Sequence, residues 1–216
     1  MSASAAARIA AIRRLVIASG NPGKLREIGQ ILAPLGIDVA AQSAYGVSDA
    51  DEPHDTFIEN ALAKARHAAR HTGLPALADD SGICVDALGG APGVRSARYA
   101  ADGDPSISQD ERNNRKLLAA LEEVDMRSAH YYCVIVLVRR HDDPQPLIAE
   151  AEWRGVVMRA PRGEGGFGYD PLFLLPGLGV SAAELPPETK NRLSHRGKAL
   201  ALLAERLRAL RGKGEA

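Results

Sequence analysis

Five acidic residues are concentrated in one part of the chain, and they could support metal-assisted chemistry. They are Asp51, Glu52, Glu59, Asp79 and Asp80. So many carboxylates in a small region require paired cations or a metal ion, unless they are simply solvated on loops. Magnesium suits such a set, because it prefers one or two carboxylates together with the phosphate oxygens of a substrate. The acids therefore predict a magnesium site, with solvated loop acids as the alternative.

A segment near the start of the chain has the composition of an anion-binding turn. It reads Ser19, Gly20, Asn21, Pro22, Gly23, Lys24. Glycines let backbone N–H groups approach a phosphate, and the lysine adds a positive charge. The segment is not a Walker A loop, because only two residues separate its glycines and Leu25 follows the lysine. By itself the pattern fits a phosphate site and a plain tight turn about equally well.

Two later segments could bind a flat ring and further oxygens. GGFGYDP, residues 165–171, joins flexible backbone to aromatic faces, and Asp170 could accept hydrogen bonds from a ring. The alternative is a hairpin turn whose aromatic residues belong to the core. Near the C-terminus, KNRLSHR supplies cations suited to phosphate or carbonyl oxygens, namely Lys190, His195 and Arg196.

Apolar runs and helix signals indicate the elements that carry these residues. Residues 14–18 predict a buried strand that enters the glycine-containing loop, and residues 37–40 predict a second strand. Between them, a helix is expected from Pro22 until Pro34 and Gly36 end it. A further apolar run over 75–78 predicts a strand that delivers Asp79 and Asp80 to its end.

A second helix is expected from about Asp55 to Gly73. It carries an apolar stripe and, beside it, a polar stripe with the spacing i, i+4, i+7 and i+11. The members of the polar stripe are Asn60, Lys64, His67 and His71. Further along, a capping box at 108–111 predicts a helix ending near Val124, residues 131–140 and 147–158 predict a long antiparallel hairpin, and an amphipathic helix is expected from Ser194.

Composition restricts the class of protein. The chain has 216 residues, and its 27 basic and 27 acidic residues give a formal net charge of zero. That balance excludes a general binder of nucleic acid or membrane surfaces, which needs a long-range positive field. The longest apolar run is strand-sized, so no membrane span is expected. Cys84 and Cys133 have apolar neighbours and predict reduced thiols in the cytoplasm. Residues 1–13 are interpreted as a flexible N-terminal extension.

Five segments occur in an order that is typical of one family. They are GNPGK, TFIENALAKA, LPALADDSGICVDALGGAPGVRSARYA, GGFGYDP and KNRLSHR. With them, the sequence resembles the Ham1/RdgB family of inosine and xanthosine triphosphate pyrophosphatases, over about Leu15 to Leu210. The resemblance implies an α/β fold, with an elongated mixed sheet flanked by helices and a nucleotide cleft between two lobes. Residues 14–212 would form this single domain, usually as a homodimer.

The resemblance also implies a reaction. Family members hydrolyse deaminated purine nucleoside triphosphates, so ITP, dITP or XTP would give the monophosphate and pyrophosphate with Mg²⁺, which keeps these bases out of the nucleotide pool. Nucleic acid and membranes would not be partners. Guanine shares the 6-keto group of these bases, so its exclusion would depend on its 2-amino group.

The matching positions take roles from the same resemblance. Ser19 to Lys24 would hold the phosphates, and Ser81 would contact the substrate. Glu52 and Asp80 would serve the metal site, and Asp80 would accept the proton of the attacking water. Lys64, Glu59 and Asp79 would complete the catalytic charge network. The base and phosphates would be bound by Phe167, Gly168, Tyr169, Asp170, Lys190, His195 and Arg196.

The sequence departs from the family pattern at two positions. Ser19 stands where the family often has Thr, and Arg95 replaces an aromatic residue. Ser19 keeps the hydroxyl, whereas Arg95 could alter a wall of the cleft or a subunit contact.

The nearest competing function is a Maf-like pyrophosphatase for pyrimidine or modified nucleotides. A different class is a nucleotide-binding sensor that does not hydrolyse its ligand.

Overall fold

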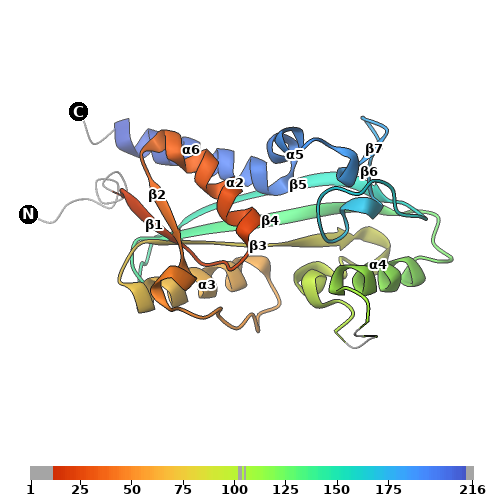
Figure 1. The fold of residues 1–216 in the computed structure, drawn as a ribbon, viewed down its shortest axis with the longest axis horizontal. Helices are drawn as coiled ribbons and strands as arrows, with labels where there is room; N and C mark the ends of the chain where they lie inside the picture. Colours follow the sequence, from red (N-terminus) through yellow and green to blue (C-terminus); the bar gives the residue numbers. More distant parts are fainter. Residues whose placement is uncertain (1–11, 102–103, 105, 213–216) are drawn as a thin grey trace, which may run out of the picture. The chain divides into compact units, whose positions relative to one another are not determined.

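The computed structural model describes residues 12–101, 104 and 106–212. Its strands form one seven-stranded sheet in the order β2-β1-β3-β4-β5-β6-β7, with helices packed on it (Figure 1). β1 pairs in parallel with β2 and β3, whereas β6 pairs in antiparallel fashion with β5 and β7, so the sheet is mixed. The expected α/β fold is confirmed. Residues 1–11 of the predicted N-terminal extension lie outside the described residues.

The elements have the following bounds. The strands are β1 (Arg14–Ile17), β2 (Asp38–Ala41), β3 (Ala76–Val85), β4 (Ser128–Val138), β5 (Leu147–Val157), β6 (Phe173–Leu175) and β7 (Val180–Ser181). The helices are α2 (Pro22–Leu32), α3 (Phe57–Thr72), α4 (Gln109–Ala120), α5 (Pro187–Leu193) and α6 (His195–Gly212). Within the described ranges, none of these helices is long and apolar enough to cross a membrane.

The chain forms two compact units. Unit 1 takes the described residues of Met1–Asp80, Cys133–Ala151 and Arg196–Ala216, and unit 2 takes Ser81–Tyr132 and Glu152–His195. The chain passes from one unit to the other four times, inside β3, β4 and β5 and at the start of α6, between His195 and Arg196. The single domain proposed for residues 14–212 stays a prediction.

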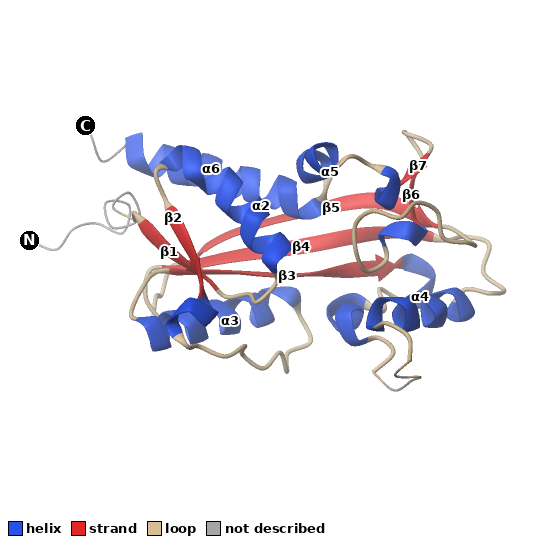
Figure 2. Ribbon diagram, viewed as in Figure 1, coloured by secondary structure: helices blue, strands red, loops and turns tan. Residues whose placement is uncertain are grey.

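In unit 1, helices cover both faces of the sheet (Figure 2). α2 and α6 lie on one face, where Ile28 and Leu32 of α2 pack with Leu200 and Leu203 of α6 in one apolar core. α3 lies on the other face and buries four alanines, whose small side chains let the helix backbone approach the strands closely. The four are Ala61, Ala65, Ala68 and Ala69.

The local signals for α2 and α3 are confirmed. Asn21 caps α2, with Pro22 in its first turn, and Gly36 adopts the left-handed conformation soon after the helix ends. Thr56 caps α3 by accepting a hydrogen bond from the backbone N–H of Glu59, and Gly73 ends this helix in the left-handed conformation. Helix α3 therefore starts two residues later than expected.

The predicted strand over 75–78 is too short. β3 runs from Ala76 to Val85, so Asp79 and Asp80 lie inside the strand rather than at its end. The strand continues because Ile83 and Val85 are fully buried beyond the polar residues. Gly82 is required there, since a Cβ atom at this position would lie 2.3 Å from the carbonyl oxygen of Gly93.

Unit 2 has an aromatic core. Tyr131, Trp153, Tyr169 and Phe173 are buried together, with Tyr131 and Phe173 ring centroids 4.7 Å apart. The predicted helix after Ser108 is present as α4 but ends at Ala120 rather than near Val124. The two long strands expected after it are present as the neighbouring strands β4 and β5.

The turn between β4 and β5 yields a prediction for stability. Asp143 is buried there and accepts hydrogen bonds from the Arg139 side chain and from the backbone N–H groups of Arg139 and Gln145. Burial alone would raise the pKa of Asp143, but these donors lower it from 3.8 to about 2. Stabilisation from a lowered pKa is complete above the unfolded value and is lost as the pH falls through the folded value.

We therefore expect Asp143→Asn to lower the free energy of unfolding by about 2 kcal/mol at pH 6, with about half of that difference left at pH 3. Urea titrations across this pH range measure it. The neighbouring exposed Asp142 pairs with exposed Arg140 and supplies the control, because Asp142→Asn should have almost no effect. A loss for Asp143→Asn that does not change with pH would show that the charge of Asp143 is not the cause.

Candidate active site

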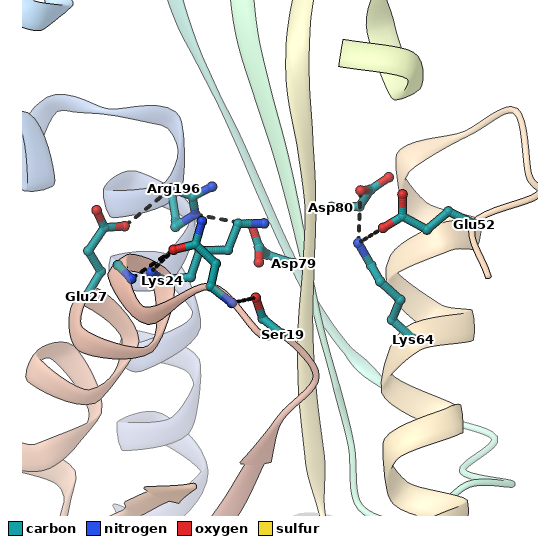
Figure 3. A network of polar contacts seen from close by, with 10 residues as sticks. Ser19, Lys24, Glu27, Glu52, Lys64, Asp79, Asp80 and Arg196 are labelled. Atoms are coloured by element: carbon teal, nitrogen blue, oxygen red, sulfur yellow. Dashed lines mark hydrogen bonds and ion pairs between the residues drawn. The ribbon is translucent and has the colours of Figure 1, made fainter. Parts of the chain in front are cut away.

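Asp79 and Asp80 lie on opposite faces of the sheet (Figure 3). Successive side chains of a strand point to opposite faces, and Leu77, two residues before Asp79, belongs to the core under α2 and α6. Asp79 accordingly faces α2 and α6, whereas Asp80 faces α3. The acids that looked like one set in the sequence are therefore divided between two sites.

Asp79 holds two cations on the face of α2 and α6. Its Oδ2 atom lies 2.9 Å from Lys24 Nζ and 3.1 Å from Arg196 Nε, and its side chain is only 1% exposed. Arg196 also pairs with Glu27 of α2, at 3.3 Å. Burial alone would raise the pKa of Asp79, but Lys24 and Arg196 outweigh burial and hold that pKa well below its ordinary value. Asp79 is therefore a permanent anion that joins β3 to both helices.

On the face of α3, one ammonium group joins two carboxylates. Lys64 Nζ lies 2.8 Å from Glu52 Oε1 and 3.0 Å from Asp80 Oδ1 (Figure 3). Burial, together with the nearby charges of Glu52 and Asp79, raises the pKa of Asp80 above its ordinary value, although Lys64 lowers it. Burial alone would lower the pKa of Lys64. The carboxylates of Asp80, Asp79 and Glu52 outweigh burial and raise this pKa above its ordinary value, so Lys64 keeps its charge.

The second oxygen of Asp80 takes no part in the ion pair with Lys64. Asp80 Oδ2 is buried and has no hydrogen-bond partner among the residues that are described. A buried carboxylate oxygen without a donor is costly unless a ligand satisfies it. The atom is therefore suited to a water molecule or a metal ion, and it lies on a carboxylate that already shares a cation with Glu52.

The donor set fits a magnesium ion that keeps other ligands. No group of three or more His, Cys, Asp or Glu residues suited to a metal ion occurs in the described part of the chain. Magnesium does not require such a group, because it usually takes one or two carboxylates and fills its other positions with water and phosphate oxygens. The hard oxygens of Glu52 and Asp80 are donors of this kind.

The predicted phosphate loop is ordered by its own side chains. Asn21 Oδ1 accepts hydrogen bonds from the N–H groups of Gly23 at 2.8 Å and Lys24 at 3.2 Å, and Ser19 Oγ accepts one from Asn21 N at 3.2 Å. Two of the N–H groups at the start of α2 are thus already satisfied. Lys24, held by Asp79, is the cation that the loop presents.

Glu59 and Ser81 take positions that the sequence did not indicate. Glu59 is exposed at the start of α3, and its carboxylate accepts a hydrogen bond of 2.6 Å from the Thr56 hydroxyl, which completes the cap of the helix. Ser81 follows Asp80 in β3 and is half-buried. Glu59 therefore has a structural role at the helix cap, and its catalytic role stays a prediction.

In unit 2, the GGFGYDP segment separates an exposed ring from a buried acid. Phe167 is 49% exposed, and Lys190 Nζ lies 4.6 Å from the centre of its ring. Asp170 is buried and accepts hydrogen bonds from Phe167 N, at 2.8 Å, and from Lys190. A Cβ atom on Gly166 would lie 2.2 Å from Asp170 Oδ2, so glycine is required at that position.

The remaining aromatic residues of the segment and of KNRLSHR are in the core. Tyr169 is buried and donates a hydrogen bond to Ser96 O at 2.8 Å, so its ring is not available as an exposed face. His195 is buried with its ring stacked on that of Tyr131, with centroids 4.7 Å apart and planes 6° apart. The Tyr131 hydroxyl donates a hydrogen bond to Asp170 Oδ1 at 3.4 Å.

Sequence reasoning missed three residues that organise unit 2. Tyr131 links Asp170 to His195, and two residues of α4 hold the peptide groups of Gly168. Asp110 Oδ2 accepts a hydrogen bond from Gly168 N at 2.7 Å, and Asn114 Nδ2 donates one to Gly168 O at 2.9 Å. The spacing i, i+4 of Asp110 and Asn114 was a signal that both face the same side of a helix, although it did not indicate their partner.

Comparison with known proteins gives consistent matches. The sequence model of the Ham1 family matches residues 15–206. A dITP/XTP pyrophosphatase of Nitrosomonas europaea is 64% identical over 91% of this chain and 95% of its own length, and one of Ralstonia nicotianae is 63% identical over 91% and 98%. The solved structure of a HAM1 protein from Coxiella burnetii has a TM-score of 0.85 and 47% identity, and covers 92% of this chain and 100% of that one. The chain belongs to the Ham1 family.

Proposed function

We propose that this protein hydrolyses deaminated purine nucleoside triphosphates, namely dITP, XTP and ITP, to the monophosphate and pyrophosphate. Relatives that are 64% and 63% identical to it over 91% of the chain carry the name dITP/XTP pyrophosphatase. The observation in the structure that carries the proposal is the ion-paired group of Glu52, Lys64 and Asp80, with an unsatisfied, buried oxygen on Asp80. Removing deaminated nucleotides keeps these bases out of the nucleotide pool.

We assign magnesium to Glu52 and Asp80. When bound, the ion would neutralise phosphate charge and lower the pKa of a coordinated water molecule. Lys64 would keep the two carboxylates together and reduce their mutual repulsion, because its ammonium group contacts both. Asp79 faces the other side of the sheet and has two cations of its own, so we exclude it from the metal site.

The chain's own residues can supply the other requirements of the reaction. Water attack on the α-phosphorus needs a proton acceptor, and Asp80 Oδ2 is a carboxylate oxygen that no protein donor occupies. The leaving pyrophosphate gains negative charge, and the cations Lys24 and Arg196 are suited to stabilise it. Asp79 acts as a positioning residue, since it holds both of these cations. Ser19 would add a hydroxyl donor to the phosphates.

We assign recognition of the purine base to residues of unit 2. The exposed face of Phe167 can stack on a purine, and Lys190, placed over that ring and anchored by Asp170, is a donor for a carbonyl oxygen. Hypoxanthine and xanthine carry a 6-keto oxygen where adenine carries an amino group. Donors that meet this oxygen would be left unpaired by adenine, which can reduce catalysis by about 10⁴-fold.

We further propose a homodimer in the cytoplasm, as the family resemblance implies. Two other functions remain possible outcomes of the experiments below. A Maf-like enzyme would prefer pyrimidine or modified nucleotides, and a sensor would bind a nucleotide without hydrolysing it. The unsatisfied oxygen of Asp80 favours hydrolysis over the sensor, because hydrolysis needs a proton acceptor beside the attacking water. The choice of nucleotide distinguishes the proposed function from the Maf-like enzyme.

The first prediction concerns the substrate. With Mg²⁺, we expect pyrophosphate release from ITP, dITP and XTP to be faster than from ATP, dTTP and UTP by about 10²-fold or more, because only the former present a keto oxygen on a purine. A coupled pyrophosphate assay measures initial rates. Preference for dTTP or UTP would support the Maf-like alternative, and tight binding of ITP without pyrophosphate release would support the sensor.

The second prediction concerns the proton acceptor. Asp80→Asn should reduce turnover of ITP by about 10²-fold or more, with a smaller effect on substrate affinity, because the amide cannot accept a proton. The variant should fold, since Lys64 keeps its pair with Glu52. Asp51→Asn changes an exposed acid of the same loop as Glu52 and is the matched control, with near wild-type turnover. A folded Asp80→Asn enzyme with normal turnover would exclude Asp80 as the base.

The third prediction concerns the metal. A chelator should abolish pyrophosphate release, and added Mg²⁺ should restore it. Glu52→Gln should raise the Mg²⁺ concentration needed for half-maximal rate by about 10-fold or more, because it removes a charged oxygen ligand. Rates measured across a Mg²⁺ titration at saturating ITP provide the comparison. Full activity in the presence of chelator would exclude this assignment.

A further inference from the structure

The loop that carries Glu52 needs an external constraint. It lies between the turn η2 (Gln42–Tyr45) and α3 and contains no helix or strand. Four acids lie on it, namely Asp49, Asp51, Glu52 and Asp55. Their mutual repulsion does not favour any one position of Glu52, and a metal ligand is effective only when its carboxylate is held in place.

Asn60 of α3 holds this loop on the C-terminal side of Glu52. Its side chain is fully buried, Asn60 Oδ1 accepts a hydrogen bond from His54 N at 3.0 Å, and Asn60 Nδ2 donates one to His54 O at 3.1 Å. The amide thus satisfies both backbone groups of one residue. An aspartate of the same shape would keep the acceptor but bring a second oxygen against the His54 carbonyl.

His67, two turns further along α3, holds the loop on the N-terminal side of Glu52. His67 Nε2 lies 3.1 Å from the carbonyl oxygen of Ser48. A carbonyl only accepts hydrogen bonds, so Nε2 carries the proton and donates. The next loop residue is fixed as well, because Gln42 Nε2 donates to Asp49 Oδ1 at 2.6 Å.

Three residues of α3, one after another along the helix, therefore contact the loop. Asn60, Lys64 and His67 have the spacing i, i+4 and i+7, which places them on one stripe of the helix. The middle member contacts Glu52, and the outer two hold the backbone at His54 and Ser48, on either side of it. The polar stripe that the sequence predicts therefore contacts the loop on both sides of the ion pair between Lys64 and Glu52.

We propose that Asn60 and His67 are positioning residues of the metal site: they fix the backbone on both sides of Glu52, so that its carboxylate meets Asp80 at the distance that a divalent cation needs. The inference rests on the proposed function in one respect, the assignment of Glu52 and Asp80 to the metal. Neither Asn60 nor His67 touches the metal or the substrate in this account. Both act through the position of Glu52.

The test uses His67, because its side chain is only partly buried and its removal leaves the core of α3 intact. His67→Ala removes the donor. His67→Gln returns an N–H group at a similar reach and should rescue the effect. Arg70→Ala is the matched control, since Arg70 is exposed in the last turn of the same helix. His71 is unsuitable as a control, because its ring centroid lies 4.4 Å from that of His67.

The first measurement is the binding of Mn²⁺ alone to the nucleotide-free protein, followed by the electron paramagnetic resonance signal of free Mn²⁺. His67→Ala should raise the dissociation constant by about 10-fold, the lower end for partners that orient a metal ligand. His67→Gln should bind within about 3-fold of wild type, and Arg70→Ala should equal wild type. Amide hydrogen exchange of residues 48–55 should rise in His67→Ala only.

The second measurement is the rate with ITP across a Mg²⁺ titration. His67→Ala should shift half-maximal activation by the same factor as Mn²⁺ binding, with the KM for ITP at saturating Mg²⁺ unchanged. Asn60→Asp should behave in the same way if it folds. An equal KM separates a positioning role from a general loss of structure, which would change KM, kcat and thermal stability together.

The outcomes separate this inference from the proposed function. If wild-type protein releases no pyrophosphate from any nucleotide, the proposed function fails, and Mn²⁺ binding alone decides the inference. If wild-type protein binds no Mn²⁺, or His67→Ala binds Mn²⁺ as tightly as wild type, the inference is overturned. A well-folded His67→Gln variant that stays as weak as His67→Ala would also overturn it, because the donated hydrogen bond would not be the cause.

Discussion

The contact on which the site depends is the ammonium group of Lys64 between the carboxylates of Glu52 and Asp80. Two like charges this close repel each other, and burial makes each charge more costly. One cation that contacts both carboxylates compensates for repulsion and burial together. Asp80 is buried, whereas Glu52 and Lys64 are partly exposed, so removing one partner should cost less than the roughly 3–5 kcal/mol of a fully buried ion pair. The group therefore constrains the positions of α3, β3 and the loop before α3 that carries Glu52.

Because side chains alternate along β3, the neighbouring residues Asp79 and Asp80 face opposite sides of the sheet and have different roles. Asp79 Oδ2 pairs with both Lys24 and Arg196, so two cations already compensate the charge of this carboxylate. Asp80 keeps a buried oxygen that no described donor satisfies. The same strand thus presents a structural anion to one face and a chemical group to the other. A register shift of one residue would exchange these roles. The buried apolar residues on either side of the pair fix the register of β3 and so keep each acid on its own face.

Much of the local structure was predictable because its causes are local. Pro22 and Gly36 bracket the first helix, Gly73 ends the second, and short apolar runs indicate the first two strands. The continuation of β3 through Asp79 and Asp80 was not predictable. Two adjacent acids disfavour a strand unless cations pair with them, and the sequence does not show which cations do. Arg196 lies 117 positions from Asp79, and no local pattern indicates such a partner. For the same reason, the sequence alone placed all five acids in one metal set.

The candidate residues of unit 2 show a similar limit. The glycines of GGFGYDP indicated a segment with special backbone requirements, and Gly166 has one, imposed by the carboxylate of Asp170. The sequence did not show that Tyr169 belongs to the core or that Asp170 is already bonded to Lys190 and Phe167 N. A residue type in a motif indicates what chemistry is available. Burial decides which side chains can use it on a ligand.

The central claim is that the carboxylates of Glu52 and Asp80 together hold a divalent cation. An anomalous difference map from crystals grown with Mn²⁺ and inosine monophosphate tests it most directly. The account predicts a peak within about 2.5 Å of an oxygen of each carboxylate. A well-ordered nucleotide with the manganese peak bonded to neither carboxylate would contradict it.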